Sequence, residues 1–241
     1  MSQNRQNPVG TRAQRGRWLE FLRPISTRES ALLGLVIWVL FFVGWEVAAW
    51  RELVNPLLLP PPEQVLVSLY DLLVNRGFGV DIGVSILRIL ASFVAACVIA
   101  IPLGVLMGSF ARIEGLFNPF VSAWRYLPAP AFIPILLAWF GTGEEPKLAL
   151  LFLGVIWFLI TLVMDHTRNV RDELIETAMT LGARRWQVLW TVIVPAVLPN
   201  ILIAMRQMLA IAWTYLVIAE IIAATNGIGA VMWRARRFLD T

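Results

Sequence analysis

The sequence predicts an all-α integral membrane protein, on the evidence of its composition and of the lengths of its apolar stretches. Of the 241 residues, 59% are hydrophobic, and the mean hydropathy is +0.73. A soluble domain has roughly 45–50% apolar residues, and its core could not take up this excess. A helix needs about 20 apolar residues to cross a bilayer. Five stretches meet this requirement and are predicted as spans: 31–50, 84–109, 117–140, 147–164 and 192–223.

The segments between these spans carry proline and arginine. Residues 1–30 are polar with six Arg, and they predict a tail rather than a cleavable signal peptide. Residues 55–65, NPLLLPPPEQV, are held extended by their prolines and lead into a short helix around 63–74. Three prolines interrupt the third span, and two lie near the start of the fifth, which is therefore tilted or kinked: Pro128, Pro130, Pro134, Pro195 and Pro199.

The distribution of arginine orients the spans. The tail 1–30 holds six Arg and the loop 165–189 holds four, whereas the loop 51–83 holds two. Because basic loops stay in the cytoplasm, the N-terminus and the loop 165–189 are predicted to be cytoplasmic. Three arginines fall after the fifth span, on the opposite side: Arg234, Arg236 and Arg237. They predict either a short outer amphipathic segment or a return span that this sequence lacks.

No catalytic, nucleotide-binding or metal site is predicted. The sequence has no G-x-x-x-x-G-K-[ST], H-E-x-x-H or G-x-S-x-G motif, and its one lysine, Lys147, follows Pro146. Cys97 is the single cysteine, so it forms no internal disulfide and no cysteine-rich metal site. The net charge of +4 is assigned to membrane topology rather than to nucleic-acid binding. These absences disfavour a membrane-embedded enzyme.

A self-contained carrier or channel is the alternative to a transport subunit that draws its energy from another chain. A proton or sodium relay uses several paired carboxylates inside the membrane. Few acidic residues lie in or near the predicted spans, and this disfavours a relay: Glu46, Asp165 and Glu220.

The charged stretch ELIETAMTLGARRWQVLWTVIVP, residues 173–195, predicts two short helices between the fourth and fifth spans. Asp172 is the expected N-cap, and Gly182 can take the left-handed conformation that ends a helix. The first helix places Leu174, Ile175, Ala178 and Met179 near one face, and the second, 184–191, places Trp186, Leu189 and Trp190 on an apolar side. The residues alone fit an interfacial helix in the lipid headgroups and a docking element for a cytoplasmic partner equally well.

The same stretch resembles the EAA loop in permease subunits of bacterial ABC importers. That motif reads E-A-A, three residues, G, nine residues and I-x-L-P. Here Glu176-Thr177-Ala178, Gly182 and 192–195 (VIVP) keep the spacing, with departures at Thr177, Val192 and Val194. Further stretches resemble the nitrate, sulfonate, taurine and bicarbonate branch of this family: PLLLPPPEQV (56–65), SILRIL and IPLG within 85–104, LPAPAFIPILLAWFGTGEEPK (127–147) and EIIAATNGIGAVM (220–232).

The resemblance implies a type I ABC importer permease fold with five or more spans. Residues 31–241 are then the permease domain, with a coupling loop at about 168–191, and relatives end in a further span expected after Thr241. The implied assembly lies in the inner membrane of a bacterium. It contains two permease copies, two ATP-binding cassette subunits that hold ATP and Mg, and an extracytoplasmic binding protein, with no cofactor in this chain. The implied ATPase-coupling residues are Glu173, Glu176, Thr177, Ala178, Met179, Leu181, Gly182, Ala183 and Pro195.

Charged residues within the spans predict where a small anion such as nitrate, a sulfonate or bicarbonate passes. Arg206 lies roughly 21 Å along the fifth span, where a charge must pair or face a wet cavity. A guanidinium fork suits planar oxyanions. The alternative is structural: Arg206 pairs with Glu220 or with carbonyls freed at a proline kink, and Trp213 and Tyr215 are packing residues. The candidate pathway residues are Arg125, Tyr126, Arg206, Trp213 and Glu220, whereas Arg88 is placed near the outer interface without a role.

Overall fold

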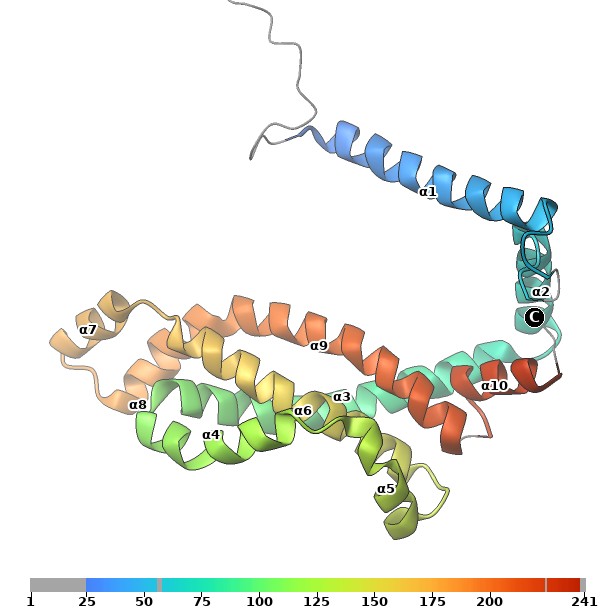
Figure 1. Cartoon of the computed structure of the whole chain (residues 1–241). Helices are drawn as coiled ribbons and strands as arrows, with labels where there is room; N and C mark the ends of the chain where they lie inside the picture. Colours follow the sequence, from blue (N-terminus) through green and yellow to red (C-terminus); the bar gives the residue numbers. More distant parts are fainter. Residues whose placement is uncertain (1–24, 56–57, 224, 239–241) are drawn as a thin grey trace, which may run out of the picture. The chain divides into compact units, whose positions relative to one another are not determined.

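The computed structural model describes residues 25–55, 58–223 and 225–238, and every regular element in these ranges is a helix (Figure 1). The chain divides into two units, residues 1–64 and 65–241, which are described separately. Most of the predicted tail 1–30 lies outside the described residues. From Thr27 onward the tail belongs to the first helix, so that span begins four residues earlier than its predicted start at 31.

The first unit is built on α1, Thr27–Trp50, whose 24 residues extend about 36 Å. The Ser26 hydroxyl accepts a hydrogen bond from the Glu29 N–H at 3.2 Å and so caps the helix start. The indole Nε1 of Trp45 donates to the carbonyl of Pro60 at 3.0 Å, which holds the proline-rich segment near the helix end. Helix α2, Pro62–Val74, begins in this unit and continues into the second, as the expected short helix around 63–74.

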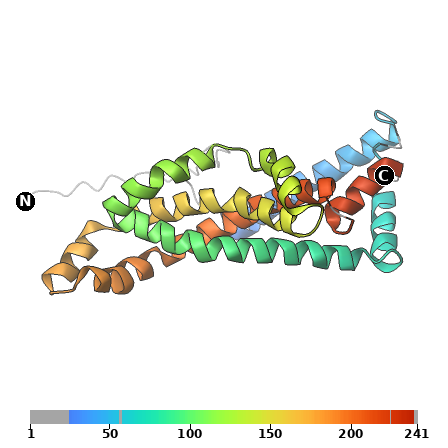
Figure 2. The same cartoon turned by 90° about the horizontal axis from the view of Figure 1, so that it is seen from below.

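The second unit contains the remaining helices. In chain order they are α3 (Phe78–Ser109), α4 (Ala111–Arg125), the 3₁₀ turn η1 (Ala129–Phe132), α5 (Ile133–Phe140), α6 (Glu145–Arg168), α7 (Asp172–Thr180), α8 (Arg185–Val188), the π segment η2 (Leu189–Ile193), α9 (Val194–Ala223) and α10 (Ile228–Phe238). Helices α3, α6 and α9 run alongside one another, with α7 and α8 at one end of the bundle and α10 at the other (Figures 1 and 2). These ends are called the α7 end and the α10 end.

A stripe of small residues on α3 lets α6 approach closely. A Cβ on Gly104 would lie 2.8 Å from the carbonyl oxygen of Ile160, and a Cβ on Gly108 would lie 2.5 Å from the Cβ of Thr167. Only glycine permits this close contact. Inside a bilayer the lipid is as apolar as the side chains, so close packing of this kind, and not the hydrophobic effect, drives the association of helices. The stripe repeats every four residues: Ser92, Ala96, Ala100, Gly104 and Gly108.

The five predicted spans correspond to helices, with one of them broken. Four helices are long and apolar enough to cross a membrane, and the pair α4 and α5 makes a fifth if its two halves form one span. The halves bend by 84° at a break of three residues, 126–128. Pro128 and Pro130 cause this break, because a proline removes a backbone donor and disfavours helix in the residue before it.

The fifth span begins earlier than predicted. Instead of a separate helix 184–191 followed by a span from 192, one continuous 38-residue helix runs over Arg185–Ile222 and contains α8, η2 and α9. Pro195 does not interrupt it, because the preceding turn widens into a π turn in which the Val194 N–H bonds to the carbonyl of Leu189. The wider turn accommodates a residue without an N–H, as is common for π segments.

The outward faces of α3 and α9 differ in polarity. Between residues 86 and 102, the exposed positions of α3 are all apolar: Ile86, Leu87, Leu90, Ala91, Val94, Ala95, Val98, Ile99 and Pro102. The exposed positions of α9 include four polar side chains: Asn200, Arg206, Gln207 and Thr214. Lipid therefore suits the outward face of α3, whereas the outward face of α9 requires water or another protein chain.

Candidate functional site

The first candidate site is the helical pair α7–α8 at the α7 end of the bundle. Helix α7 begins at Asp172, with Arg171 in extended conformation as its N-cap, so the prediction that Asp172 caps the helix is wrong by one residue. Asp172 and Glu173 occupy the first turn, where negative charge favours the positive end of the helix dipole. No side chain forms a capping hydrogen bond at this helix start, so the two carboxylates of the first turn are what stabilise it.

The turn after α7 is closed by its own backbone. Gly182 has φ +87°, the left-handed conformation that was predicted. The N–H of Gly182 bonds to the carbonyl of Met179 at 3.0 Å, and the N–H of Ala183 bonds to the carbonyl of Ala178 at 3.1 Å. These two bonds define a Schellman motif, which places the residue at this one position in the left-handed conformation that glycine adopts most easily. The spacing between Ala178 and Gly182 is thereby fixed by geometry.

The second arm of the pair starts at Arg184, whose backbone N–H bonds to the Gln187 side chain at 2.7 Å. Helix α8 then leads without interruption into α9. Leu189 is buried, whereas Trp186 is 58% exposed and Trp190 is 64% exposed. The three residues predicted to share an apolar side are therefore divided: Leu189 belongs to the core, and the two tryptophans lie on the surface. The ring centres of Trp186 and Phe110 are 5.7 Å apart.

The α7–α8 pair rests on the ends of the bundle helices. A cleft of about 440 Å³ separates it from the junction of α3 and α4 and is lined on one side by Ile175 and Met179 and on the other by Phe110 and Arg112. Ile175 and Ala178 pack against the core. Arg168, at the end of α6, donates to Glu114 of α4 at 2.8 Å. The pair is thus carried by helix ends that are themselves tied together.

The predicted coupling residues divide by exposure. Leu181, at the tip of the turn, is 83% exposed and Met179 is 51% exposed. Ala178 and Ala183 are half-buried beneath them, while the rest are exposed: Glu173, Glu176, Thr177, Gly182 and Pro195. The turn thus presents an exposed apolar side chain, Leu181, at the α7 end, and the helix before it carries two exposed carboxylates, Glu173 and Glu176.

The predicted pathway residues are not brought together in one place. Arg206 and Trp213 lie two turns apart on the outward face of α9, and Arg206 forms no hydrogen bond or ion pair with the described residues. Arg125 ends α4, with its guanidinium 5.3 Å from the ring centre of the exposed Tyr126. Glu220 is fully buried near the α10 end. The structural alternative that pairs Arg206 with Glu220 is wrong, because the Glu220 carboxylate is bonded elsewhere.

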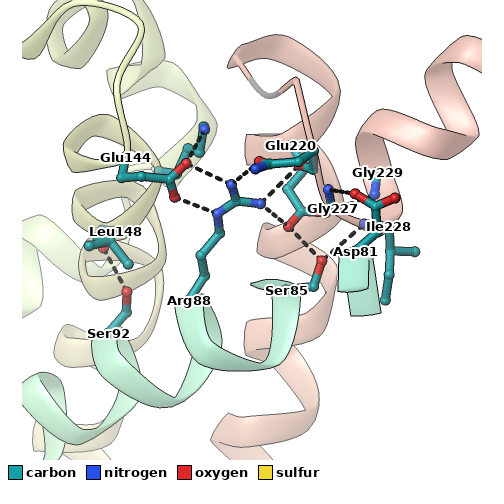
Figure 3. Close-up of polar contacts among 12 residues, drawn as sticks. Asp81, Ser85, Arg88, Ser92, Glu144, Leu148, Glu220, Gly227, Ile228 and Gly229 are labelled. Carbon is teal, nitrogen blue, oxygen red and sulfur yellow. Dashed lines mark hydrogen bonds and ion pairs between the residues drawn. The ribbon is translucent and has the colours of Figure 1, made fainter. Parts of the chain in front are cut away.

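The partner of Glu220 is Arg88, a residue for which the sequence alone predicts no role. Arg88 Nη1 donates to Glu220 Oε1 at 2.7 Å, and the exposed fractions of the two side chains are 3% and 0% (Figure 3). Glu220 also accepts from the Ser85 hydroxyl at 2.7 Å and from the Gly229 N–H at 2.8 Å. Arg88 and Glu220 are 132 residues apart in sequence, so no local pattern pairs them.

The residues after the fifth span form α10, which is 11 residues long and too short to cross a bilayer. It lies beside the start of α3, and Arg234 donates to the carbonyl of Thr225 at 2.6 Å. A short helix here fits both predictions for this segment, the outer amphipathic segment and the stretch that a return span would follow. Within the described residues, no group of three or more His, Cys, Asp or Glu side chains could hold a metal ion.

The fold and these features define a class: a multi-span helical membrane subunit that presents a charged helical pair at one end. Residues 100–241 match the family described as "Binding-protein-dependent transport system inner membrane component", and the chain belongs to this family of ABC importer permeases. This confirms the family that the EAA-like spacing indicated.

Relatives and a solved structure agree with this assignment. The taurine transport system permease protein TauC of Escherichia coli is 36% identical, over 93% of this chain and 83% of that protein. The putative aliphatic sulfonates transport permease protein SsuC of Bacillus subtilis is 29% identical (91% and 79%), and the nitrate import permease protein NrtB of Synechocystis is 28% identical (80% and 72%). A chain of the inward-facing MetNI methionine ABC transporter superposes with a TM-score of 0.57 at 21% identity, over 65% of this chain and 79% of that one. The predicted permease fold is thereby confirmed.

Proposed function

We propose that this chain is the membrane subunit of an importer that moves a small oxyanion, of the sulfonate or nitrate type, using the energy of a separate ATPase. In this proposal two copies of the chain, two ATPase subunits that bind ATP and Mg, and an extracytoplasmic binding protein form the working complex. The α7 end faces the cytoplasm and the α10 end faces outward. Four arginines near the α7 end support this orientation: Arg168, Arg171, Arg184 and Arg185.

The observation that carries the coupling role is the exposed Schellman turn between α7 and α8. Leu181 is an apolar side chain with 83% exposure on a turn closed by backbone bonds. An exposed apolar residue on a rigid, charged support is typical of an anchor that fills a pocket on a partner. Because α8 continues into α9, a force applied to the turn acts directly on a membrane-spanning helix.

Glu176→Lys tests this role. The reversed charge sits on the exposed side of α7, so the variant is expected to reach the membrane in normal amount while ATPase co-purification and uptake fall at least tenfold. The matched control is Glu63→Lys, which makes the same charge change at an exposed carboxylate of a different helix, α2. Normal uptake and normal co-purification by Glu176→Lys would refute the coupling role. Uptake by the chain alone, without any ATPase, would favour the self-contained carrier.

The outward face of α9 supports the anion pathway. Arg206 lies mid-span on this face without a partner among the described residues, and its planar fork is suited to a sulfonate or nitrate group. A second copy of the chain facing it would enclose a wet channel. The three relatives named for taurine, sulfonates and nitrate all concern oxyanions or molecules that carry one.

Arg125 is the second cationic group of the proposed pathway and lies at a different depth. Its neighbour Trp124 stacks on Trp157 of α6, with ring centres 5.5 Å apart, and Tyr215 of α9 contacts Gly154 one turn away on α6. Arg206 is nine residues before Tyr215, about 13 Å further toward the α7 end. Two guanidinium groups at two depths would pass an anion in steps.

Arg206→Lys and Arg206→Gln test this pathway. Lysine keeps the charge and loses the fork, so uptake is expected to continue with a raised KM, whereas glutamine should reduce uptake strongly. ATPase co-purification should be normal in both variants, which separates this role from coupling. Wild-type KM and rate in the glutamine variant would exclude Arg206 from the pathway.

A further inference from the structure

Arg88 uses every N–H donor of its guanidinium group. Its Nε and Nη2 donate to the two oxygens of Glu144 at 2.6 and 2.7 Å, and its Nη1 donates to Glu220 at 2.7 Å. The remaining two donors bond to Asn226, to the backbone carbonyl at 3.0 Å and to the side-chain oxygen at 2.6 Å. A guanidinium has five N–H donors, so Arg88 is saturated.

These bonds fasten two separate loops to α3 at the α10 end. Glu144 ends the loop between α5 and α6, and Asn226 belongs to the loop between α9 and α10. The second loop is also held by Asp81 of α3, which accepts from the Gly227 N–H at 2.6 Å, and by Ser85, whose oxygen accepts from the Ile228 N–H at 2.9 Å (Figure 3). One face of α3 therefore sets the position of both loops.

The ion pairs of the network form two halves, and each pair is electrically neutral. On the α6 side, Lys147 donates to Glu144 at 2.8 Å, and both residues lie on the same segment. On the other side, Arg88 of α3 pairs with Glu220 of α9. If the α6 segment moves away, Glu144 and Lys147 leave together and Arg88 keeps three of its five hydrogen bonds. Separation therefore strands no unpaired buried charge, which is the usual cost of breaking a buried ion pair.

The contact between the halves is open to solvent on one side. The Glu144 side chain is 51% exposed, whereas those of Arg88 and Lys147 are 3% and 4% exposed. A partner arriving at the α10 end can therefore reach Glu144 directly and compete for its oxygens. The Arg88–Glu220 ion pair behind it is buried and cannot be reached from solvent.

We infer that the bidentate Arg88–Glu144 contact is a latch that holds the outer end of the permease closed, and that Arg88 is the positioning residue on which the outer loops depend. This inference rests on the proposed function and orientation. The latch opens when the binding protein, through a cationic group, takes over the Glu144 carboxylate, so that the α6 segment 144–147 separates from α3 and α9.

Protonation does not open the latch at ordinary pH. The hydrogen bonds from Arg88, followed by the one from Lys147, lower the pKa of Glu144 to about 2. A guanidinium group stays protonated in proteins. Release at neutral pH therefore requires competition by another charged group, which ties opening to the arrival of the partner.

The test measures ATP hydrolysis by the full complex in lipid nanodiscs, with and without the binding protein. Glu144→Gln keeps the size of the side chain, but its amide has a single acceptor oxygen, so one of the two bonds to Arg88 is lost and the other no longer ends on an anionic group. A charge-assisted hydrogen bond is about twice as strong as a neutral one, so the rate without binding protein is expected to rise about tenfold. The ratio of stimulated to basal rate should fall correspondingly. Glu145→Gln is the matched control, because Glu145 is the exposed next residue and forms no hydrogen bond or ion pair with the described residues.

Arg88→Lys supplies a second, independent variant. Lysine keeps the charge and cannot bond both Glu144 oxygens and Glu220 at once, so it should raise the basal rate as well. Adding Glu144→Gln to Arg88→Lys should raise the basal rate little further, because Arg88→Lys already breaks the contact with Glu144.

Three results are decisive. A raised basal rate in Glu144→Gln, with Glu145→Gln unchanged, supports the latch. An unchanged or lower basal rate in Glu144→Gln overturns it, and a loss of both rates together with a lowered melting temperature shows that the contact is structural alone. If the wild-type complex itself shows no stimulation by the binding protein, the proposed function is refuted, and the latch, which rests on it, is refuted with it; an unchanged basal rate in Glu144→Gln alongside normal wild-type stimulation refutes the latch alone.

Discussion

Gly104→Ala should destabilise the second unit by overpacking the interface of α3 and α6. The added Cβ would lie 2.8 Å from both the Ile160 carbonyl oxygen and the Val163 Cβ, whereas ordinary contacts begin at 3.4 Å. The two backbones must therefore separate by at least about 0.6 Å, the difference of these distances, and overpacking of this kind costs about 1–3 kcal/mol. For a chain of this size each kcal/mol lowers the melting temperature by about 2–4 °C.

Cys97 provides the assay for this loss of stability. It is the single cysteine of the chain and is buried in the core, so a thiol-reactive fluorophore labels it only when the core opens. Melting curves of the purified permease in nanodiscs should show Gly104→Ala several degrees below wild type. Gly83→Ala is the matched control on the same helix, because no atom lies within 4 Å of the position its Cβ would take. A Gly104→Ala protein that melts with or above the control would refute the close approach of α3 and α6.

Three further predictions concern turns and loops. Gly182→Ala places a side chain at φ +87°, which costs a strain of about 1–2 kcal/mol and should weaken co-purification of the ATPase. Asparagine tolerates this conformation, so Gly182→Asn should retain more of the ATPase than Gly182→Ala. Equal ATPase binding by both variants would contradict this prediction. Gly227→Ala, at φ +105°, directs its Cβ at the Glu220 carboxylate and at Arg88 Nη1 and should lower the melting temperature more than Gly182→Ala, where nothing lies within 4 Å. The pKa of Glu144 is lowered from 4.5 to about 2, so its stabilising effect is complete above pH 4.5 and is lost as the pH falls toward 2. Acid melting curves of Glu144→Gln should accordingly be flatter than those of wild type in this window, and identical curves would show that the contact contributes nothing.

The spans and the turn after α7 could be predicted because their signals are local. Twenty apolar residues predict a span wherever they pack, and a left-handed helix end requires glycine, so Gly182 marks the turn in the sequence itself. The start of the fifth span was misplaced because Pro195 suggests a helix boundary, whereas a π turn absorbs it. The free-energy cost of a proline inside a helix depends on the width of the helical turn before it, and the helix propensities of single residues do not describe that width.

The Arg88 network was missed because its members come from four parts of the chain. Pairing Arg88 with Glu220 requires knowing that the start of α3 packs beside the end of α9. Arg206 was a reasonable candidate partner for Glu220 by sequence distance, yet 14 residues of helix place the two about 21 Å apart along α9. One signal was available: Arg88 and Glu220 both fall at the ends of their spans that the topology assigns to the same side.

The helix from Arg185 to Ile222 is continuous and about 57 Å long. The exposed turn joins one of its ends, and Glu220 lies near the other. A tilt of about 5° around the midpoint would shift each end by about 2.5 Å in opposite directions, given a half-length of about 28 Å. This shift is comparable to the length of a hydrogen bond. A small displacement of this helix at the α7 end can therefore change which hydrogen bonds form at the α10 end, since no break in the helix separates the two ends.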